Sequence, residues 1–328
     1  MDATATLSRH VFHPLWDWKD GSSRLGYLKA LERTQWRSLA ENLAEQQRLL
    51  REQSTHAARN VPHYQRAFAA AGVDPATVTL ETLRRLPLLT KTQIRELGPQ
   101  LIARGFDPAQ LKYHKTGGST GVALQTFFEE SWQERRNADA MRANQWAGWY
   151  HGMKVAAIWG NPPRADTLKK RLRSALFDRI MYLDTMRIDN ASLDDFIRRW
   201  RSEQPQIVYG HSHSIFLVAR YLREQGITDL RPRGIVSTSM MLLPQERAVI
   251  EDAFGCKVTD RYGCEEVSLI ACECERHSGM HLNIEHVVVE EGIPILELQA
   301  TRAEYEILLD ELPQRGLDVF HECPALLT

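Results

Sequence analysis

The sequence predicts an α/β fold in which a helix-rich N-terminal part precedes a mostly parallel sheet covered by helices. From about Leu25 to Gln110, apolar residues recur at spacings of three and four with few glycines, which is the period of amphipathic helices. From about Tyr113 to Val289, short apolar runs alternate with amphipathic segments, as in strands joined by helical crossovers. We therefore divide the chain into 1–110, 111–291 and an atypical tail, 292–328.

The helix-rich part contains two predicted boundaries. Asn60, Val61 and Pro62 interrupt its longest helical pattern, because proline cannot continue a helix. The stretch LPLLTKTQIREL reads as a turn followed by a new helix, for which Thr90 is the expected N-cap.

The following part contains three apolar runs that predict buried strands: VAAIWG, IVYGH and GIVSTSM. Helices are expected near Leu168 to Phe177 and near Ile215 to Gln225. The stretch FGCKVTDRYG predicts a further extended segment that ends at a Tyr-Gly pair.

Composition limits the class of protein. Lys and Arg total 41 against 42 for Asp and Glu, so we expect no nucleic-acid or membrane-surface partner. The start has no basic segment followed by an apolar run, and no stretch reaches about 18 apolar residues, so we expect a cytoplasmic protein without membrane insertion. Five cysteines, four of them between Cys256 and Cys274, fit a reducing compartment. The sequence does not decide whether the protein forms a homodimer.

The stretch KTGGSTG, from Lys115, is a candidate phosphate-binding loop. Its glycines let backbone N–H groups turn toward an anion, and its hydroxyl groups add donors. It lacks the Gly-Lys-Ser/Thr of a Walker A motif. The candidate ligands are Thr116, Gly117, Gly118, Ser119, Thr120 and Gly121. A flexible Gly/Ser turn is the alternative.

The stretch DRYGCEE, from Asp260, combines an aromatic ring with carboxylates at the end of a predicted strand. The ring of Tyr262 beside Gly263 could flank a purine, and Glu265 or Glu266 could help to hold Mg²⁺, which prefers oxygen ligands. The alternative is a solvated pair of surface glutamates.

Cysteine and histidine cluster just after this stretch. Cys272 and Cys274 alternate along a predicted strand, His277 begins a turn, and the return strand would bring His281 opposite Cys274. Two thiolates and two imidazoles could hold Zn²⁺, with Cys264 as a spare ligand. Buried cysteines without a metal are the alternative.

The ordered motifs resemble those of the adenylate-forming superfamily, in particular its phenylacetate-CoA ligase and CapK-like branch. The resemblance lies in KTGGSTG, RYGCEE and THAARNVPHYQRAFAAAGVD…LPLLTKTQIRE, and extends to IVYGHSHSIFLVARYL and STSMMLLPQERAVIEDAFGCKV. It spans about residues 25 to 290 and implies the large N-terminal domain of an acyl-CoA synthetase-like fold.

The resemblance also implies a reaction and its cofactors. Members of the superfamily activate a carboxylic acid with ATP and Mg²⁺ to an acyl adenylate, and often pass the acyl group to coenzyme A. By resemblance, 116–121 would bind phosphate, Tyr262 and Gly263 would border the adenine, and Glu266 would be the catalytic, Mg²⁺-associated glutamate. The further nucleotide-binding candidates are Ser237, Thr238, Ser239 and Glu265.

A substrate pocket is expected where apolar strands end. Its candidate residues are Trp159, Tyr209, His211 and Ser212. Their aromatic character favours an aryl or acyl carboxylate as the small-molecule substrate, and core packing is the alternative.

The sequence departs from the family at its end. Members continue into a small lid domain whose lysine meets the carboxylate being activated, whereas the last lysine here is Lys257. We therefore expect a truncated chain in which adenylation is impaired or incomplete, since loss of one such charge costs about 100-fold or more in rate. The alternative is a non-catalytic nucleotide- or acyl-binding remnant acting in polysaccharide or lipid assembly, so the sequence leaves open whether the chain is an enzyme.

Overall fold

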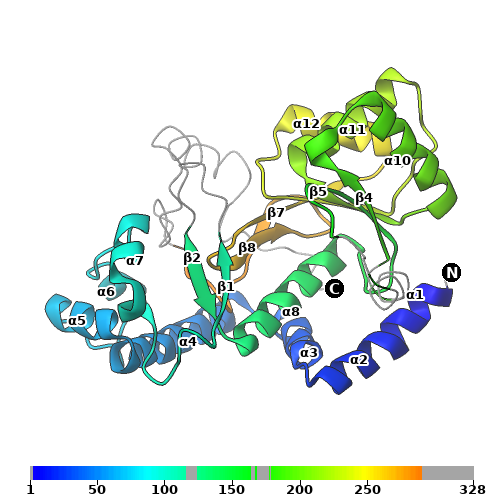
Figure 1. Ribbon diagram of the computed structural model, residues 1–328. Coiled ribbons are helices and arrows are strands. Elements are labelled where there is room, and N and C mark those ends of the chain that lie inside the picture. Colours follow the sequence, from blue (N-terminus) through cyan, green and yellow to red (C-terminus); the bar gives the residue numbers. More distant parts are fainter. Residues whose placement is uncertain (1–2, 116–123, 164–166, 168–176, 178, 290–328) are drawn as a thin grey trace. The chain divides into compact units, whose positions relative to one another are not determined.

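The computed structural model describes residues 3–115, 124–163, 167, 177 and 179–289 (Figure 1). Contacts divide the chain into two compact units. The sheet unit comprises 1–31, 134–264 and 268–281, and the helical unit comprises 32–133, 265–267 and what is described of 282–328. Contacts therefore group the first 31 residues with the sheet, although their sequence resembles that of the helices that follow.

A mostly parallel sheet forms the centre of the sheet unit, as the sequence predicts. In the described residues its strand order is β4-β3-β5-β6-β7-β8-β9, and the first five are parallel neighbours, whereas β7 and β8 pair antiparallel. The strands are β3 Val155–Trp159, β4 Ile180–Asp184, β5 Ile207–His211, β6 Gly234–Thr238, β7 Val258–Cys264, β8 Ser268–Glu273 and β9 Met280–Leu282. The three predicted strands are confirmed as β3, β5 and β6.

Helices α10 Asn190–Glu203, α11 Ser212–Glu224 and α12 Pro244–Phe254 gather beside this sheet (Figure 1). Their apolar faces pack against one side of the central strands, where Phe196, Ile215 and Phe254 are fully buried with Ile158 and Ile235. Burying a side chain of this size contributes about 1.5–3 kcal/mol, so this layer is the main core of the unit.

The N-terminal helices, as far as Leu31, also belong to the sheet unit. They are α1 Ala3–Leu7, the π-helix η1 Ser8–Phe12, α2 His13–Asp20 and α3 Arg24–Thr34. Leu28 and Leu31 of α3 pack against Ala138 and Met141 of α8, which runs from Glu130 to Trp146. This packing anchors the N-terminal helices to the unit.

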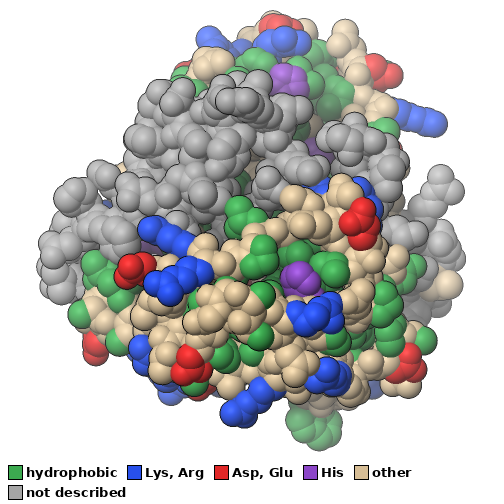
Figure 2. Space-filling model, turned by 90° about the vertical axis from the view of Figure 1, so that its left-hand side faces the viewer, with side chains coloured by type: hydrophobic (Ala, Val, Ile, Leu, Met, Phe, Trp, Pro, Cys, Tyr) green, Lys and Arg blue, Asp and Glu red, His purple; other side chains and the backbone are tan. Residues whose placement is uncertain are grey.

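The helical unit is built mostly from one long helix and several shorter ones. They are α4 Leu39–Asn60, α5 Pro62–Ala71, α6 Leu80–Leu83, α7 Lys91–Leu97 and the 3₁₀-helix η2 Gly98–Leu101. The predicted break is confirmed, because Val61 is extended between α4 and α5. Thr90 is confirmed as the N-cap of α7, where it forms a capping box with Gln93. Acidic and basic side chains are interspersed over the face in Figure 2.

Strands β1 Lys112–Lys115 and β2 Gln125–Phe128 of the helical unit pair antiparallel. The candidate phosphate loop, 116–121, joins them but lies outside the described residues, as do the tail 292–328 and all but the last residue of the helix predicted near Leu168 to Phe177.

One predicted segment begins later than expected. Phe254 ends α12 and Gly255 adopts a left-handed conformation with φ of 68°, so the extended chain begins only at Val258. No helix among the described residues has both the length and the apolar character needed to cross a membrane.

Candidate ligand site at the carboxyl edge of the sheet

The carboxyl ends of neighbouring parallel strands bring several predicted site residues to one edge of the sheet. Trp159 ends β3, His211 ends β5 and Thr238 ends β6, and His211 pairs in register with Thr238. Parallel α/β sheets bind ligands at this edge. The 3₁₀-helix η4 Thr185–Arg187 follows β4 at the same edge.

Aromatic rings line this edge. Trp159 and Tyr209 stack with centroids 5.4 Å apart and planes 8° apart, and His211 meets Trp159 edge-on at 4.0 Å. Trp149, which the sequence did not single out, packs against Tyr209 at 5.4 Å. Such pairs contribute about 0.5–1.5 kcal/mol each beyond the area they bury. We call these four residues the aromatic wall.

The aromatic wall carries no fixed charge. Its four residues are half-buried, and burial lowers the pKa of His211, which favours the neutral imidazole. Side chains alternate along a strand, so Trp159, Tyr209 and His211 share the sheet face opposite the main core, which takes Ile158 and Val208. The wall is therefore a second, incompletely covered apolar surface.

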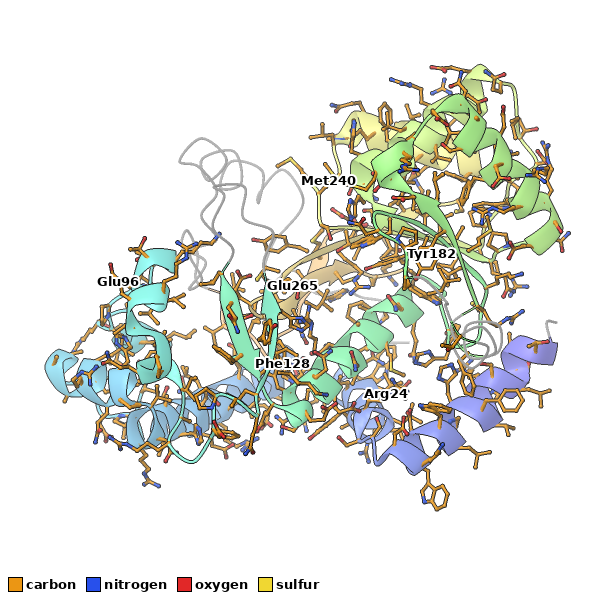
Figure 3. All side chains as sticks on the ribbon, viewed as in Figure 1. Arg24, Glu96, Phe128, Tyr182, Met240 and Glu265 are labelled. Carbon is orange, nitrogen blue, oxygen red and sulfur yellow. The ribbon has the colours of Figure 1, made fainter. Side chains whose placement is uncertain are left out.

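Strand β6 ends beside the wall at Thr238, and the chain bends at Ser239 and Met240. We call 238–240 the polar turn. Ser239 holds a left-handed conformation with φ of 66° and is exposed, and Thr238 is half-buried. Met240, 47% exposed, lies at the outer end of this turn (Figure 3). Thr238 and Ser239 are thus the two accessible hydroxyl groups of the predicted Ser-Thr-Ser segment.

Two other predicted hydroxyl groups are occupied within the protein. Ser237 is fully buried and its Oγ donates to Asp260 at 2.9 Å. Ser212 is fully buried and its Oγ donates to the carbonyl of Met240 at 2.8 Å. These bonds make both serines supports of the polar turn, so we do not assign them to a ligand.

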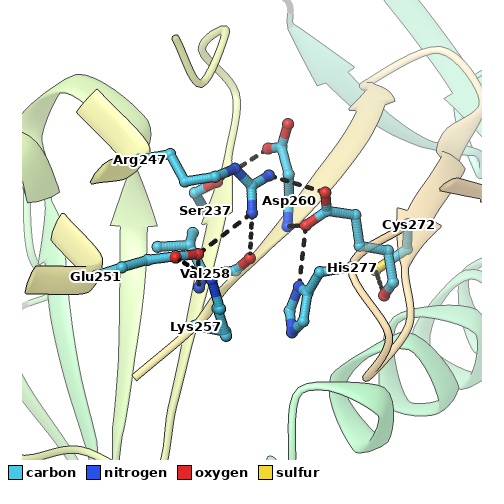
Figure 4. Close-up of polar contacts among 9 residues, drawn as sticks. Ser237, Arg247, Glu251, Lys257, Val258, Asp260, Cys272 and His277 are labelled. Atoms are coloured by element: carbon cyan, nitrogen blue, oxygen red, sulfur yellow. Dashed lines mark hydrogen bonds and ion pairs between the residues drawn. The ribbon is translucent and has the colours of Figure 1, made fainter. Parts of the chain in front are cut away.

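A buried polar network lies behind the polar turn (Figure 4). The backbone N–H of Asp260 and the guanidinium of Arg247 donate to the two carboxylate oxygens of Glu273, at 2.9 and 2.8 Å. Burial raises the pKa of Glu273, but the hydrogen bond with His277, the charge of Arg247 and the Asp260 N–H outweigh it, so the pKa stays below its ordinary value. The network joins β6, β7 and the end of β8 to α12.

Tyr262 and Gly263 lie on β7, where a bulge interrupts the pairing with β8. A Cβ atom on Gly263 would lie 2.4 Å from the carbonyl oxygen of Ser268, so only glycine fits there. Tyr262 is half-buried, Glu265 is exposed in the turn that follows (Figure 3), and Glu266 is half-buried.

The predicted zinc ligands do not form a metal centre in this geometry. Cys272 is fully buried beside Ala143 and Leu269, and burial raises the pKa of its thiol to about 12, which opposes the thiolate that zinc requires. His277 contacts Glu273, and the ring of His281 lies 5.4 Å from that of Trp146. Cys274, just past the end of β8, is also buried. Within the described residues, no three His, Cys, Asp or Glu side chains are grouped to hold a metal ion.

Comparison with known proteins supports the fold. No protein-family model matches the chain. It is 24% identical over 212 residues to Protein CapK of Staphylococcus aureus, a match that covers 63% of this chain and 46% of CapK.

Two crystal structures of a 2-hydroxyisobutyryl-CoA ligase are similar to this chain. The complex with 2-HIB-AMP and CoA has a TM-score of 0.57 at 20% identity and covers 76% of this chain and 58% of the ligase. The postadenylation state with 2-HIB-AMP has a TM-score of 0.53 at 18% identity, over 75% of this chain and 56% of the ligase. The chain therefore spans about half the length of these relatives.

The chain thus shares the fold of these ligase structures, a helix-rich part with a mostly parallel sheet. Its similarity to Protein CapK agrees with the CapK-like resemblance of its motifs.

Proposed function

We propose that this chain activates a carboxylic acid with ATP to an acyl adenylate at the carboxyl edge of the sheet, and that coenzyme A accepts the acyl group. The observation that carries the proposal is the convergence of Trp159, His211 and the polar turn on one edge of a fold shared with a ligase that binds an acyl adenylate and CoA.

The aromatic wall suits the body of the acid. Trp159 and Tyr209 offer a flat apolar surface, and the neutral His211 adds a hydrogen-bonding edge without a charge. An aryl or acyl group would pack there with its carboxylate toward the polar turn. Thr238 and Ser239 would then donate to oxygens of the nucleotide.

We assign the binding of the adenine to β7. Tyr262 would flank the base, and Gly263 next to it lets the backbone of β7 approach Ser268 closely. The loop 116–121 would bind the triphosphate, which remains a prediction from the sequence.

The residues present fit Mg²⁺, because this ion is usually held by one or two carboxylates together with substrate phosphates, and Glu266 offers one. When bound, Mg²⁺ would neutralise phosphate charge during the transfer. We therefore keep Glu266 as the catalytic candidate, with Glu265 beside it.

Pyrophosphate release tests the proposal. The full chain is incubated with Mg-ATP and a panel of benzoate, phenylacetate, acetate and 2-hydroxyisobutyrate, with and without coenzyme A. We expect acid-dependent pyrophosphate and an acyl adenylate detected by mass spectrometry. Absence of both, together with no thermal shift from Mg-ATP, would refute the proposal. A thermal shift without pyrophosphate would replace it by the non-catalytic binding role.

Trp159→Ala tests the aromatic wall. Loss of the ring is expected to raise KM for the acid about tenfold while KM for ATP is unchanged, since a buried aromatic contact contributes about 1.5 kcal/mol or more. Trp36→Ala is the matched control, because Trp36 is 57% exposed in the helical unit. Equal effects of the two substitutions would exclude the wall as the acid site.

A further inference from the structure

We propose that the sheet unit holds a second ligand site, at the amino ends of β3 and β4, for a small neutral planar molecule that carries one hydrogen-bonding group. The site is a hollow of about 230 Å³. Val155 and Ile180 form one side of it, and Trp16, Trp149 and Phe177 supply aromatic rings. The imidazoles of His13 and His151 also line it.

The hollow shares Trp149 with the aromatic wall but lies at the opposite end of the strands. Val155 and Ile180 are the first residues of β3 and β4 and pair in register, whereas Trp159 is the last residue of β3. At about 3.3 Å per residue, the two ends of β3 are about 13 Å apart. The second site therefore lies at the edge of the sheet away from the proposed acyl-adenylate site.

His151 provides a hydrogen-bonding atom that the described residues leave without a partner. Its Nε2 is buried and forms no hydrogen bond with any of them, while its ring stacks on that of His13 at 4.5 Å and 24°. Leaving a buried polar atom unsatisfied costs about 1–3 kcal/mol. A ligand hydroxyl or amide in the hollow would recover that cost.

The charge around His151 favours a neutral ligand. Burial, followed by the charges of His13 and Arg24, lowers the pKa of His151 to about 4, and Asp17 opposes and Arg9 assists this shift. The guanidinium of Arg24 is paired with the buried Asp17, with Nε donating at 3.0 Å. The ion pair has no net charge, so Arg24 does not present an unpaired cation to an anionic ligand.

Shape and size favour a planar ligand with one or two rings. Phe177 packs against Trp16 at 5.2 Å and meets His13 edge-on at 5.6 Å, so flat ring faces and edges form the sides of the hollow. A dry apolar cavity of about 150 Å³ accepts benzene. A hollow of about 230 Å³ accordingly takes phenol or indole.

Titration of the full chain with phenol, benzene and benzoate, without ATP, tests this site. The imidazole signals in a ¹H–¹³C correlation spectrum report on it, with those of the exposed His56 as the internal control. We expect phenol to shift the His13 and His151 signals in a saturable manner, benzene to bind more weakly and benzoate to leave them unchanged. No saturable shift with phenol, or an equal response to benzoate, overturns the proposal.

The variant His151→Leu separates the hydrogen bond from the apolar fit. We expect it to weaken phenol binding about tenfold and to leave benzene binding within a factor of about two. Equal affinity of wild type and variant for phenol overturns the assigned role of Nε2. If the variant does not fold, the wild-type titration alone decides. Because ATP is absent throughout, failure here is independent of the acyl-adenylate proposal.

Discussion

Replacing Arg247 by methionine tests the buried network that supports the polar turn. Arg247 Nη2 donates to Glu273 Oε1 at 2.8 Å, and the side chains are 26% and 9% exposed. Removing one partner of a buried ion pair costs about 3–5 kcal/mol, because the other charge stays buried. Arg247 is partly exposed, and Glu273 keeps its bonds to the Asp260 N–H and His277. We therefore expect the lower end, a loss of about 3 kcal/mol in the free energy of unfolding.

Urea unfolding followed by circular dichroism measures this loss. Arg201→Met is the matched control, since Arg201 pairs with Asp229 at a similar 2.7 Å but both side chains are 52% exposed. Exposed pairs contribute at most about 1 kcal/mol. If the two variants lose the same stability, burial does not decide the strength of the Arg247 pair and the reasoning is wrong.

The same pair predicts a pH dependence. Glu273 has a lowered pKa in the folded protein, so its contribution is present above the unfolded value of 4.5 and is lost as pH falls through the folded value. Without Arg247 the folded pKa moves up. The loss of stability that Glu273 contributes at acid pH should therefore be smaller in Arg247→Met than in the wild type and should be complete at a higher pH.

Three further outcomes are expected. Gly263→Ala should lower the free energy of unfolding by about 1–3 kcal/mol, because its Cβ would meet the Ser268 carbonyl. Gly26→Ala should raise it by about 0.5–1 kcal/mol, because Gly26 lies in a helix and its Cβ would meet nothing within 4 Å. Changes of the same sign in chemical denaturation would contradict this. Folding lowers the pKa of His151 from 6.5 to about 4, so the free energy of unfolding should fall by about 3 kcal/mol as pH drops through that window. His151→Leu should remove this part of the pH dependence when unfolding is measured at several pH values. Glu266→Gln should slow pyrophosphate release about 100-fold while Mg-ATP still raises Tm, and unchanged turnover would remove its catalytic role.

Local signals explain why the central strands could be predicted. VAAIW and IVYGH are continuous apolar runs because parallel strands covered on both faces have few positions that face water. The helix boundaries could also be predicted from local signals, since the capping box at Thr90 and the extended Val61 before Pro62 depend on residues close in sequence. These features need no knowledge of distant contacts.

Tertiary partners explain what the sequence could not decide. Ser212, Ser237 and Thr238 look equivalent as hydroxyl donors, but the Met240 carbonyl takes the first and Asp260 takes the second. Cys272 was expected to face a metal, yet its side chain packs in the core of the sheet unit. Both outcomes depend on segments far away in the chain, which no local pattern reveals.

The alternation of side chains along β3 and β5 connects the core to both proposed sites. Ile158 and Val208 face the helices and are fully buried, whereas Val155, Trp159 and Tyr209 face the opposite side. That second face is apolar at both ends of the strands, but its ends differ chemically. The carboxyl end adjoins the hydroxyl groups of the polar turn, to which we assign the nucleotide, and the amino end adjoins His151, whose pKa burial lowers, and an arginine that is paired with Asp17. One strand pattern therefore yields two ligand surfaces of different selectivity, and Trp149, which lines the hollow and packs on Tyr209, is the contact through which occupancy of one could alter the other.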